Sequence, residues 1–327
     1  MKTTKLRAHK RHLVAFALSL ACAMSARAEA SYPNHPIRVI VPAAPGGLLD
    51  VTTRLVAQKM GEALGVSVIV ENRAGGETLL GTQVVKNADP DGYTILAAAN
   101  NMTARPAFYK DPGYDLMKDF APVGPMIRAP LVMLVPPSGP KTLGDFVVDA
   151  KATPNKVSFA SGGVGTPQYV AAALFQHDAN LQLLHVPYTG NGAAMPDVMS
   201  GRVNVIFDGY GSSVGYVKSQ KLRPIGVTSD ARLQDLPGVP TIAEQGYPKY
   251  DYYLWLGLLA PAGTPPDAIT RLSDALHKAL NSKELSSRFR REGSEAMLMS
   301  PAQFRQYLKG DLVQMSKLVT DAGIEKR

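Results

Sequence analysis

Glycine-rich segments follow four of the β-branched runs in this sequence, and their composition suits them to holding a small ligand. Glycines let the backbone come close to a ligand and aim several N–H groups at one point. A helix that begins after such a loop adds the positive end of its dipole, which favours an anion such as a carboxylate. Glycines also make tight turns, but four similar loops favour one shared pocket. The segments are residues 42–50, 73–78, 161–166 and 189–192.

Two short motifs admit other chemistry. Residues 211–215 read Gly-Ser-Ser-Val-Gly and fit the G-x-S-x-G pattern of a hydrolase nucleophile elbow, so an exported serine hydrolase using Ser213 is an alternative. A hydrolase triad needs a later histidine, and only His277 follows, within an apolar helical pattern. Residues 163–168 begin like a dinucleotide fingerprint, but Gln168 stands where the third glycine belongs. No cofactor is expected.

The first 28 residues have the pattern of an export signal. A basic stretch precedes an apolar run at 13–24 and then Ala26-Arg27-Ala28, which predicts cleavage after Ala28. That run is shorter than the roughly 20 residues of a membrane-spanning helix, so an anchor is the weaker interpretation. Lipid attachment at Cys22, the only cysteine, is a minor alternative. The mature protein is expected to be soluble, periplasmic and free of disulfides.

Charge and histidine spacing exclude several functions. Residues 1–28 hold six of the 35 basic residues and no acidic residue, which leaves 29 basic and 27 acidic residues in the mature chain. Such a balance argues against nucleic acid as a partner, because phosphate binding needs a dense basic face. The four histidines after residue 28 have no metal-ligand spacing, so no metal site is expected.

The elements that must position the loops alternate between strand and helix. Alternation of this kind predicts an α/β fold with mainly parallel sheets, in which ligands bind beyond the carboxyl ends of the strands. After Pro265 the pattern becomes nearly continuous helix. Thr142 and Asp145 form a helix-start signal. Strands are expected at 37–41, 66–70, 93–98, 131–135, 157–160, 181–186, 203–207 and 222–228, and helices at 51–64, 143–151, 166–175, 268–280 and 301–319.

Ordered motifs along the mature chain carry a family resemblance. The opening Tyr32-Pro33 and the segment Ala44-Pro45-Gly46-Gly47 with Asp50 are similar to the start of the Bug (TctC-type) family. These are periplasmic solute-binding proteins of tripartite tricarboxylate transporters. The likeness continues, in order, through residues 70–73, 90–94, 119–123, 160–163, 185–188, 240–241 and 260–265.

The resemblance implies a two-domain periplasmic-binding-protein (Venus-flytrap, type II-like) fold with a cleft between the domains. Domain I would comprise residues 29–126 plus 252–327, and domain II residues 127–251. Members bind small carboxylates largely through backbone groups and ordered water. No Lys or Arg lies within 42–50, 161–168 or 189–192, which agrees with that mode. The expected partners are a small organic carboxylate and the membrane components of such a transporter, and the protein is expected to act as a monomer.

The candidate ligand-binding residues follow from the loops and the resemblance together. Asp208 keeps a typical family acid, which either accepts a hydrogen bond from a ligand amine or hydroxyl or caps the next turn. The full set is Ala43, Ala44, Pro45, Gly46, Gly47, Asp50, Gly76, Thr78, Asn100, Ser161, Gly163, Gly165, Thr166, Gln168, Thr189 and Asp208.

Several pocket positions depart from the family pattern. Ala43 stands where an aromatic residue is usual, which predicts a wider cleft. Glu77 and Thr78 replace small residues, and a carboxylate there either faces solvent or repels an anionic ligand. Gln168 and Thr189 stand where His and Lys are common. These changes leave the ligand class open. Separately, a sensor that presents its ligand to a signalling partner remains an alternative to a transporter component.

Overall fold

The computed structural model of the 327-residue chain describes residues 32–321 and 325–326. The expected export signal at 1–28, with Cys22 and the cleavage site, lies outside the described residues. A single mixed sheet runs through the rest, in the strand order β2-β1-β3-β9-β4-β7-β5-β6, with β8 and β10 also paired to β4. The strands are β1 (Ile37–Val41), β2 (Val68–Asn72), β3 (Thr94–Ala99), β4 (Phe120–Val135), β5 (Ser158–Ser161), β6 (Leu184–Pro187), β7 (Val205–Gly209), β8 (Arg223–Val227), β9 (Tyr253–Pro261) and β10 (Glu295–Ala296).

Helices connect most of the strands and cover the sheet. Those between the parallel strands follow the expected α/β alternation, and the C-terminal segment is helical apart from the short strand β10. The helices are α2 (Leu48–Leu64), α3 (Leu79–Lys86), α4 (Asn101–Phe108), α5 (Leu116–Asp119), α6 (Leu143–Ala152), α7 (Pro167–Ala179), α8 (Asn191–Met199), α9 (Tyr210–Lys218), α10 (Pro266–Leu280), α11 (Lys283–Arg291) and α12 (Pro301–Asp321), with a 3-10 turn at Ala243–Gln245.

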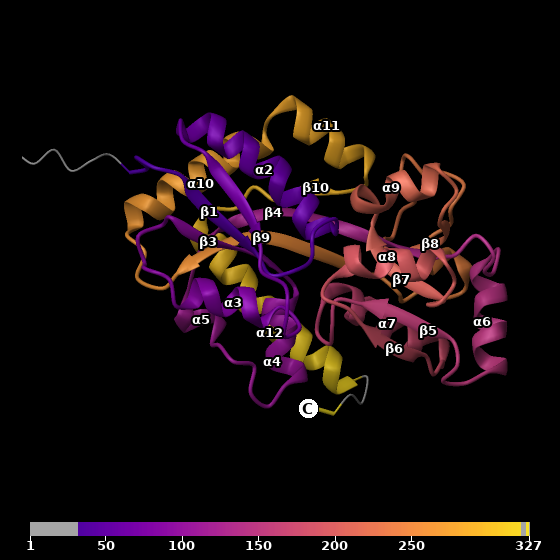
Figure 1. Cartoon of the computed structure of the whole chain (residues 1–327). Coiled ribbons are helices and arrows are strands. Elements are labelled where there is room, and N and C mark those ends of the chain that lie inside the picture. Colours follow the sequence, from indigo (N-terminus) through magenta and orange to yellow (C-terminus); the bar gives the residue numbers. More distant parts are fainter. Residues whose placement is uncertain (1–31, 322–324, 327) are drawn as a thin grey trace, which may run out of the picture. The chain divides into compact units, whose positions relative to one another are not determined.

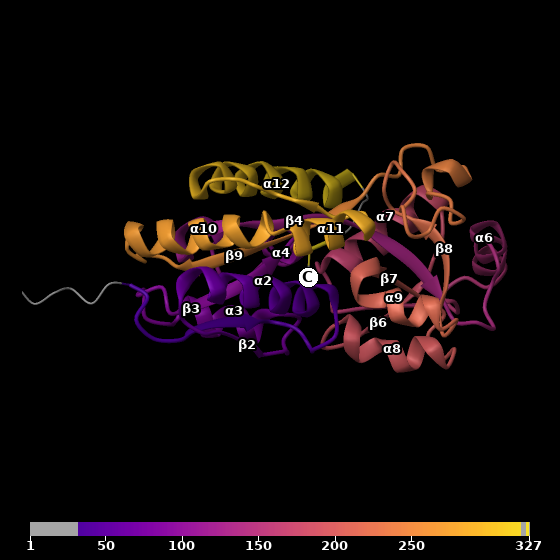
Figure 2. The same cartoon turned by 90° about the horizontal axis from the view of Figure 1, so that it is seen from above.

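Two long antiparallel strands, β4 and β9, join the two halves of the sheet. Strands β1, β2 and β3 are parallel to one another, and β3 pairs with β9. On the other side, β5, β6 and β7 are parallel, and β7 pairs with β4. In Figure 1 the elements β5 to β8 and α6 to α9 therefore lie together at one end, and β1 to β3 with α2 to α5 lie at the other; Figure 2 shows the same division from above.

The expected strand positions are correct to within two or three residues, apart from the start of β4 and the unexpected strands β9 and β10. The first part of β4, residues 120–130, was not expected because Pro122, Pro125 and Pro130 lack a backbone N–H. Register shifts between Pro122 and Gly124 and between Pro125 and Ile127 accommodate two of these prolines. Strand β9 was missed altogether, because nearly all of its residues are buried and no alternation marks it.

The core is anchored where β9 meets α12. The fully buried Trp255 of β9 packs edge-on against Phe304 of α12, with ring centroids 5.5 Å apart. Its indole Nε1 donates to a carboxylate oxygen of the buried Asp311 at 2.7 Å, and Thr103 of α4 donates to the same oxygen. Burial raises the pKa of Asp311, which these two hydrogen bonds partly offset. The contacts fix α12 and α4 against the centre of the sheet.

This anchor predicts a large destabilisation by Phe304→Ala. The ring is fully buried, so its removal leaves a cavity and should lower the free energy of unfolding by about 3–5 kcal/mol. The matched control on the same helix is Val313→Ala, because Val313 is 70% exposed and its truncation should change the free energy by less than about 0.5 kcal/mol. Urea unfolding followed by circular dichroism measures both, and similar effects for the two variants would contradict the assignment.

Candidate ligand-binding site

A narrow pocket lies among the loops at the carboxyl ends of β1, β2, β3, β5 and β6, beside β9. Its cavity volume is about 50 Å³, and its walls are largely apolar. That space holds a few waters or a small polar group. All four glycine-rich loops contribute to its wall. The expected residues that line it are Ala43, Ala44, Gly47, Asp50, Thr78, Thr166 and Gln168. Residues that line it and were not expected are Leu48, Leu49, Ala99, Asn101, Gly162, Pro167, Gly190, Asn191, Leu254 and Leu256.

Four helices begin at this pocket. Helix α2 starts at Leu48, α4 at Asn101, α7 at Pro167 and α8 at Asn191, and each of these residues is part of the wall. The first N–H groups of a helix have no acceptor within the helix, and they carry the positive end of the dipole. None of the lining residues is Lys or Arg. The positive groups of the wall are therefore backbone N–H groups at the helix starts.

Asp50 is the one acidic residue of the wall, and its carboxylate is bound by neighbouring groups of the protein. Its carboxylate accepts hydrogen bonds from Gly46 N at 2.9 Å, Arg54 Nε at 3.0 Å and Asn72 Nδ2 at 3.0 Å. Burial alone would raise the pKa of Asp50, but these hydrogen bonds outweigh it and hold the pKa below its ordinary value. The N–H of Gly46, which the sequence suggested for a ligand, is thus donated to Asp50 and holds the turn that starts α2.

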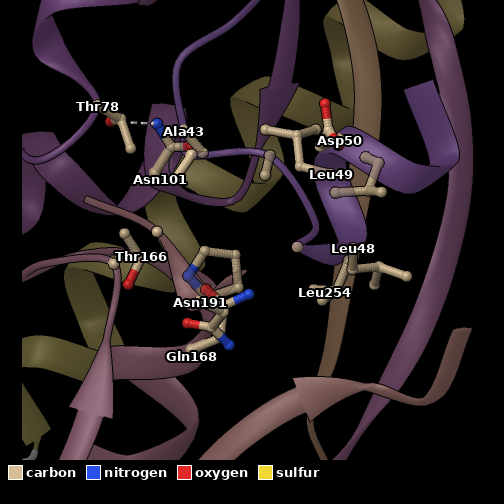
Figure 3. Close-up of a pocket in the computed structure, with 17 residues that line it drawn as sticks. Ala43, Leu48, Leu49, Asp50, Thr78, Asn101, Thr166, Gln168, Asn191 and Leu254 are labelled. Atoms are coloured by element: carbon tan, nitrogen blue, oxygen red, sulfur yellow. Dashed lines mark hydrogen bonds between the residues drawn. The ribbon is translucent and has the colours of Figure 1, made fainter. Parts of the chain in front are cut away.

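The loops from the two halves of the sheet touch each other beside the pocket. Ala44 N donates to Thr189 O at 2.9 Å. A Cβ atom on Gly192 would lie 2.1 Å from Pro45 O, so only glycine allows this approach. Figure 3 shows Thr78 and Asn101 on one side of the pocket, Leu48 and Leu49 on another, and Gln168 and Asn191 below. The pocket is enclosed by segments far apart in the sequence.

The other expected residues lie outside the pocket wall, some of them buried behind it and others exposed. Asn100 Oδ1 accepts a hydrogen bond from Trp255 N at 2.6 Å, so its side chain positions β9. Ser161 is fully buried, and its Oγ is hydrogen-bonded to His185 Nε2 at 2.8 Å. Gly165 packs against Arg105. The expected residues that the structure does not place in the pocket wall are Pro45, Gly46, Gly76, Asn100, Ser161, Gly163, Gly165, Thr189 and Asp208.

Asp208 lies fully buried at the end of β7, one layer behind the pocket. Its Oδ1 accepts from Asn191 Nδ2 at 2.9 Å and its Oδ2 accepts from Ser212 Oγ at 2.7 Å. Burial raises the pKa of Asp208 to about 6, although hydrogen bonds from Ser212, Asn191 and Gly209 partly offset that effect. Because Asn191 lines the pocket, Asp208 orients a pocket residue and also binds the first turn of α9.

The motif around Ser213 does not assemble a triad. Ser213 is fully buried within α9, and its Oγ donates to Gly209 O at 2.9 Å. The ring of His277, on α10, is hydrogen-bonded through Nε2 to Met299 O. A hydrolase needs these two side chains to be hydrogen-bonded to each other. Across residues 32–321 and 325–326, no group of three or more His, Cys, Asp or Glu side chains could hold a metal ion.

Among the helices of the described segments, none combines the length and the apolar character that crossing a membrane requires.

The pocket residues that were not expected are only weakly marked by local sequence patterns. Leu48 and Leu49 follow a glycine loop directly, and Asn191 lies within one, so helix starts could have indicated them. Leu254 and Leu256 come from β9, which was not predicted, and no local pattern distinguishes a leucine in a pocket wall from one in a core.

The raised pKa of Asp208 predicts a specific pH dependence. The ordinary value is 3.8 and the folded value about 6, so between these pH values the folded protein keeps a proton that the unfolded chain has lost. The stabilising contribution is present at low pH and is lost as pH rises through about 6; at 1.4 kcal/mol per unit the loss is about 2–3 kcal/mol. Urea unfolding across this range should show wild type losing stability relative to Asp208→Asn as pH rises. Parallel curves would contradict the prediction.

Comparison with known proteins agrees with the family resemblance. The profile of the tripartite tricarboxylate transporter family receptor matches residues 52–324. A relative from Pseudomonas sp. (strain P51), the UPF0065 protein in the tcbD-tcbE intergenic region, is 34% identical over 94% of this chain and 92% of its own. The solved structure of the periplasmic binding protein BugD is 30% identical, with a TM-score of 0.87 over 90% of this chain and all of that chain.

A second solved structure shares the same architecture. The Rpa4515 protein of R. palustris, solved with adipate, is 28% identical, with a TM-score of 0.86 over 90% of this chain and all of that chain. The fold inferred from the sequence, an α/β two-domain periplasmic-binding-protein fold with a cleft between the domains, is confirmed by these likenesses. The resemblance drawn from the motifs is confirmed as well: the chain belongs to the tripartite tricarboxylate transporter receptor (TctC) family of periplasmic solute-binding proteins.

Proposed function

We propose that this protein captures a small organic carboxylate in the periplasm and presents it to the membrane components of a tripartite tricarboxylate-type transporter. The observation that carries the proposal is the convergence of four helix N-termini on a pocket without Lys or Arg. Backbone N–H groups at helix starts bind carboxylates without a fixed cationic side chain. The adipate in the related Rpa4515 structure supports the same ligand class.

The proposal includes binding and closure but no catalytic step. Domain I is proposed to comprise residues 29–126 plus 252–327, and domain II residues 127–251, with the ligand enclosed between them. The long strands β4 and β9 are the connections about which such domains would move. The contacts of Ala44 with Thr189 and of Pro45 with Gly192 then belong to the closed arrangement. The protein is proposed to act as a monomer.

A screen of carboxylic acids tests the ligand class. A ligand present at 100 times its dissociation constant adds about 2.7 kcal/mol to the stability of the folded protein, which a thermal-shift assay detects. The panel should contain monoacids and diacids of increasing length, matched amines and sugars, and citrate. Stabilisation by amines or sugars, with none by any acid, would contradict the proposal.

Closure is tested by Gly192→Ala. Alanine suits the first turn of α8 better than glycine does, so stability without ligand should not fall. The added Cβ would lie 2.1 Å from Pro45 O, so the loops cannot meet as they do here, and affinity for the acid found in the screen should fall at least about tenfold, or roughly 1.4 kcal/mol. The control is Gly215→Ala in α9, where a Cβ meets nothing within 4 Å. Calorimetry should show unchanged affinity for the control; equal affinities for both variants would exclude this closed contact.

Export is tested by the mature N-terminus. The Ala26-Arg27-Ala28 pattern predicts cleavage after Ala28, so protein from a periplasmic extract should begin at Glu29 in mass spectrometry. An intact N-terminus or a lipid on Cys22 would contradict this prediction.

A further inference from the structure

The side chain of Glu77 bridges two loops that belong to different halves of the sheet. Glu77 lies in the loop between β2 and α3, and its Oε1 accepts a hydrogen bond from Val164 N, in the loop between β5 and α7, at 3.3 Å. Tyr109 OH donates to Oε2. A Cβ atom on Gly163 would lie 2.6 Å from Glu77 Cγ, so the opposite loop leaves room for this side chain. The carboxylate of the half-buried Glu77 is therefore held by hydrogen bonds from both sides.

This bridge lies at one margin of the pocket. Thr78, next to Glu77, lines the pocket, and so do Gly162 and Thr166 on either side of Val164. Thr78 Oγ1 accepts a hydrogen bond from Asn101 Nδ2 at 2.9 Å, which Figure 3 shows on the side of the pocket away from Leu48 and Leu49. Both Glu77 and Thr78 have positive φ angles, of 52° and 77°, a region that non-glycine residues rarely adopt. This strained turn places the carboxylate of Glu77 at the margin of the pocket.

The negative charge of Glu77 is not paired with a cation. In the described part of the chain, the salt bridges of Lys and Arg go to other carboxylates. Arg105 lies nearby, but its guanidinium donates to the backbone oxygens of Glu77 and Pro112 and stacks on the ring of Tyr109. The two partners of the carboxylate, a hydroxyl and a backbone N–H, are neutral. The charge of Glu77 is therefore not neutralised by a salt bridge, and the residue adjoins Thr78 of the pocket wall.

We propose that Glu77 is a specificity-determining residue that selects carboxylates whose far end is uncharged. The inference rests on the proposed function, in which one ligand carboxylate is held by helix N-termini such as those of α2 and α8. The far end of that ligand then approaches Thr78 and Thr166. A second carboxylate there would meet the charge of Glu77 and would find Val164 N–H already donated. Repulsion of like charges within a water-poor pocket gives discrimination against the wrong ligand.

The test compares acids that differ only by a second carboxylate, for wild type and Glu77→Gln. The pairs are butanoate with succinate, hexanoate with adipate, and benzoate with terephthalate, titrated by calorimetry. Wild type should bind the monoacid of its best pair more tightly than the diacid. Glu77→Gln keeps the shape of the side chain and removes its charge, so it should raise the ratio of diacid to monoacid affinity about tenfold or more. An unchanged ratio overturns the inference.

Two control variants separate charge from mechanical closure. Tyr109→Phe removes a hydrogen bond of the bridge but keeps the charge, so it should weaken both acids of a pair alike and leave their ratio within about twofold. Glu71→Gln makes the same change in net charge at a residue that pairs with Arg38 and Arg73 and does not line the pocket, so both affinities should stay as in wild type. If Glu77→Gln weakens both acids equally, as Tyr109→Phe does, Glu77 is only a closing contact and the inference is wrong.

If Glu77→Gln does not unfold cooperatively, Glu77→Gly carries the same test, because glycine readily adopts the positive φ at this position.

Two further outcomes are distinguishable. If wild type binds neither acid of any pair while a non-acidic compound of the thermal-shift panel stabilises it, the proposed function fails and this inference fails with it. If wild type binds monoacids and diacids equally well, the proposed function stands and the role of Glu77 is excluded.

Discussion

The antiparallel pairing of β4 with β9 is the interaction on which the rest of the structure depends. It runs from Phe120 opposite Pro261 to Pro130 opposite Tyr253, and β4 then continues into pairs with β7 and β8. Each half of the sheet is thus built onto one of two strands that are bonded to each other. The parallel strands on both sides direct their carboxyl ends, and hence their loops, toward the same region. A pocket between loops from residues 42–50 and 161–192 is the geometric result.

The positive groups of the pocket wall are peptide N–H groups at helix starts, and this affects the side chains around the pocket. A lysine or arginine in the wall would attract anions over a longer range and in many orientations, whereas helix N-termini act within about a turn. The acid in the wall, Asp50, is accordingly neutralised by Arg54 and bonded to Gly46 N. The buried Asp208 carries its carboxylate behind Asn191 and not in the pocket. Acidic groups near the site thus shape the loops, while selectivity depends on small differences such as the charge of Glu77.

The sequence allowed the α/β class, the glycine loops and the family to be predicted, because these depend on local periodicity, turn residues and ordered motifs. It did not allow β9 to be predicted, since its burial comes from pairing with β3 and β4 far away in the chain. The same limit applies within the site. Gly46 and Leu48 are two residues apart, yet the N–H of one is donated to Asp50 while the other begins a helix at the pocket. Glu77 was expected either to face solvent or to repel the ligand, and its bond to Val164 could not be inferred from either local segment.

Several glycines mark close contacts between the two halves of the molecule, which composition did not reveal. A Cβ on Gly163, Gly192, Gly209 or Gly211 would lie within 2.6 Å of Glu77, Pro45, Leu48 or Glu292, respectively. All four glycines lie within residues 127–251, and all four partners lie outside that range. Only Gly163 among them has a positive φ, so at the other three the backbone itself does not require glycine. Their common reason is close approach of the other half of the molecule. The half at residues 127–251 therefore lacks a side chain where Glu77, Leu48, Glu292 and the Pro45 carbonyl approach it, and Gly293 does the same for Leu233 in the opposite direction, where a Cβ would lie 2.0 Å away. Contact between the halves thus depends on missing methyl groups on both sides.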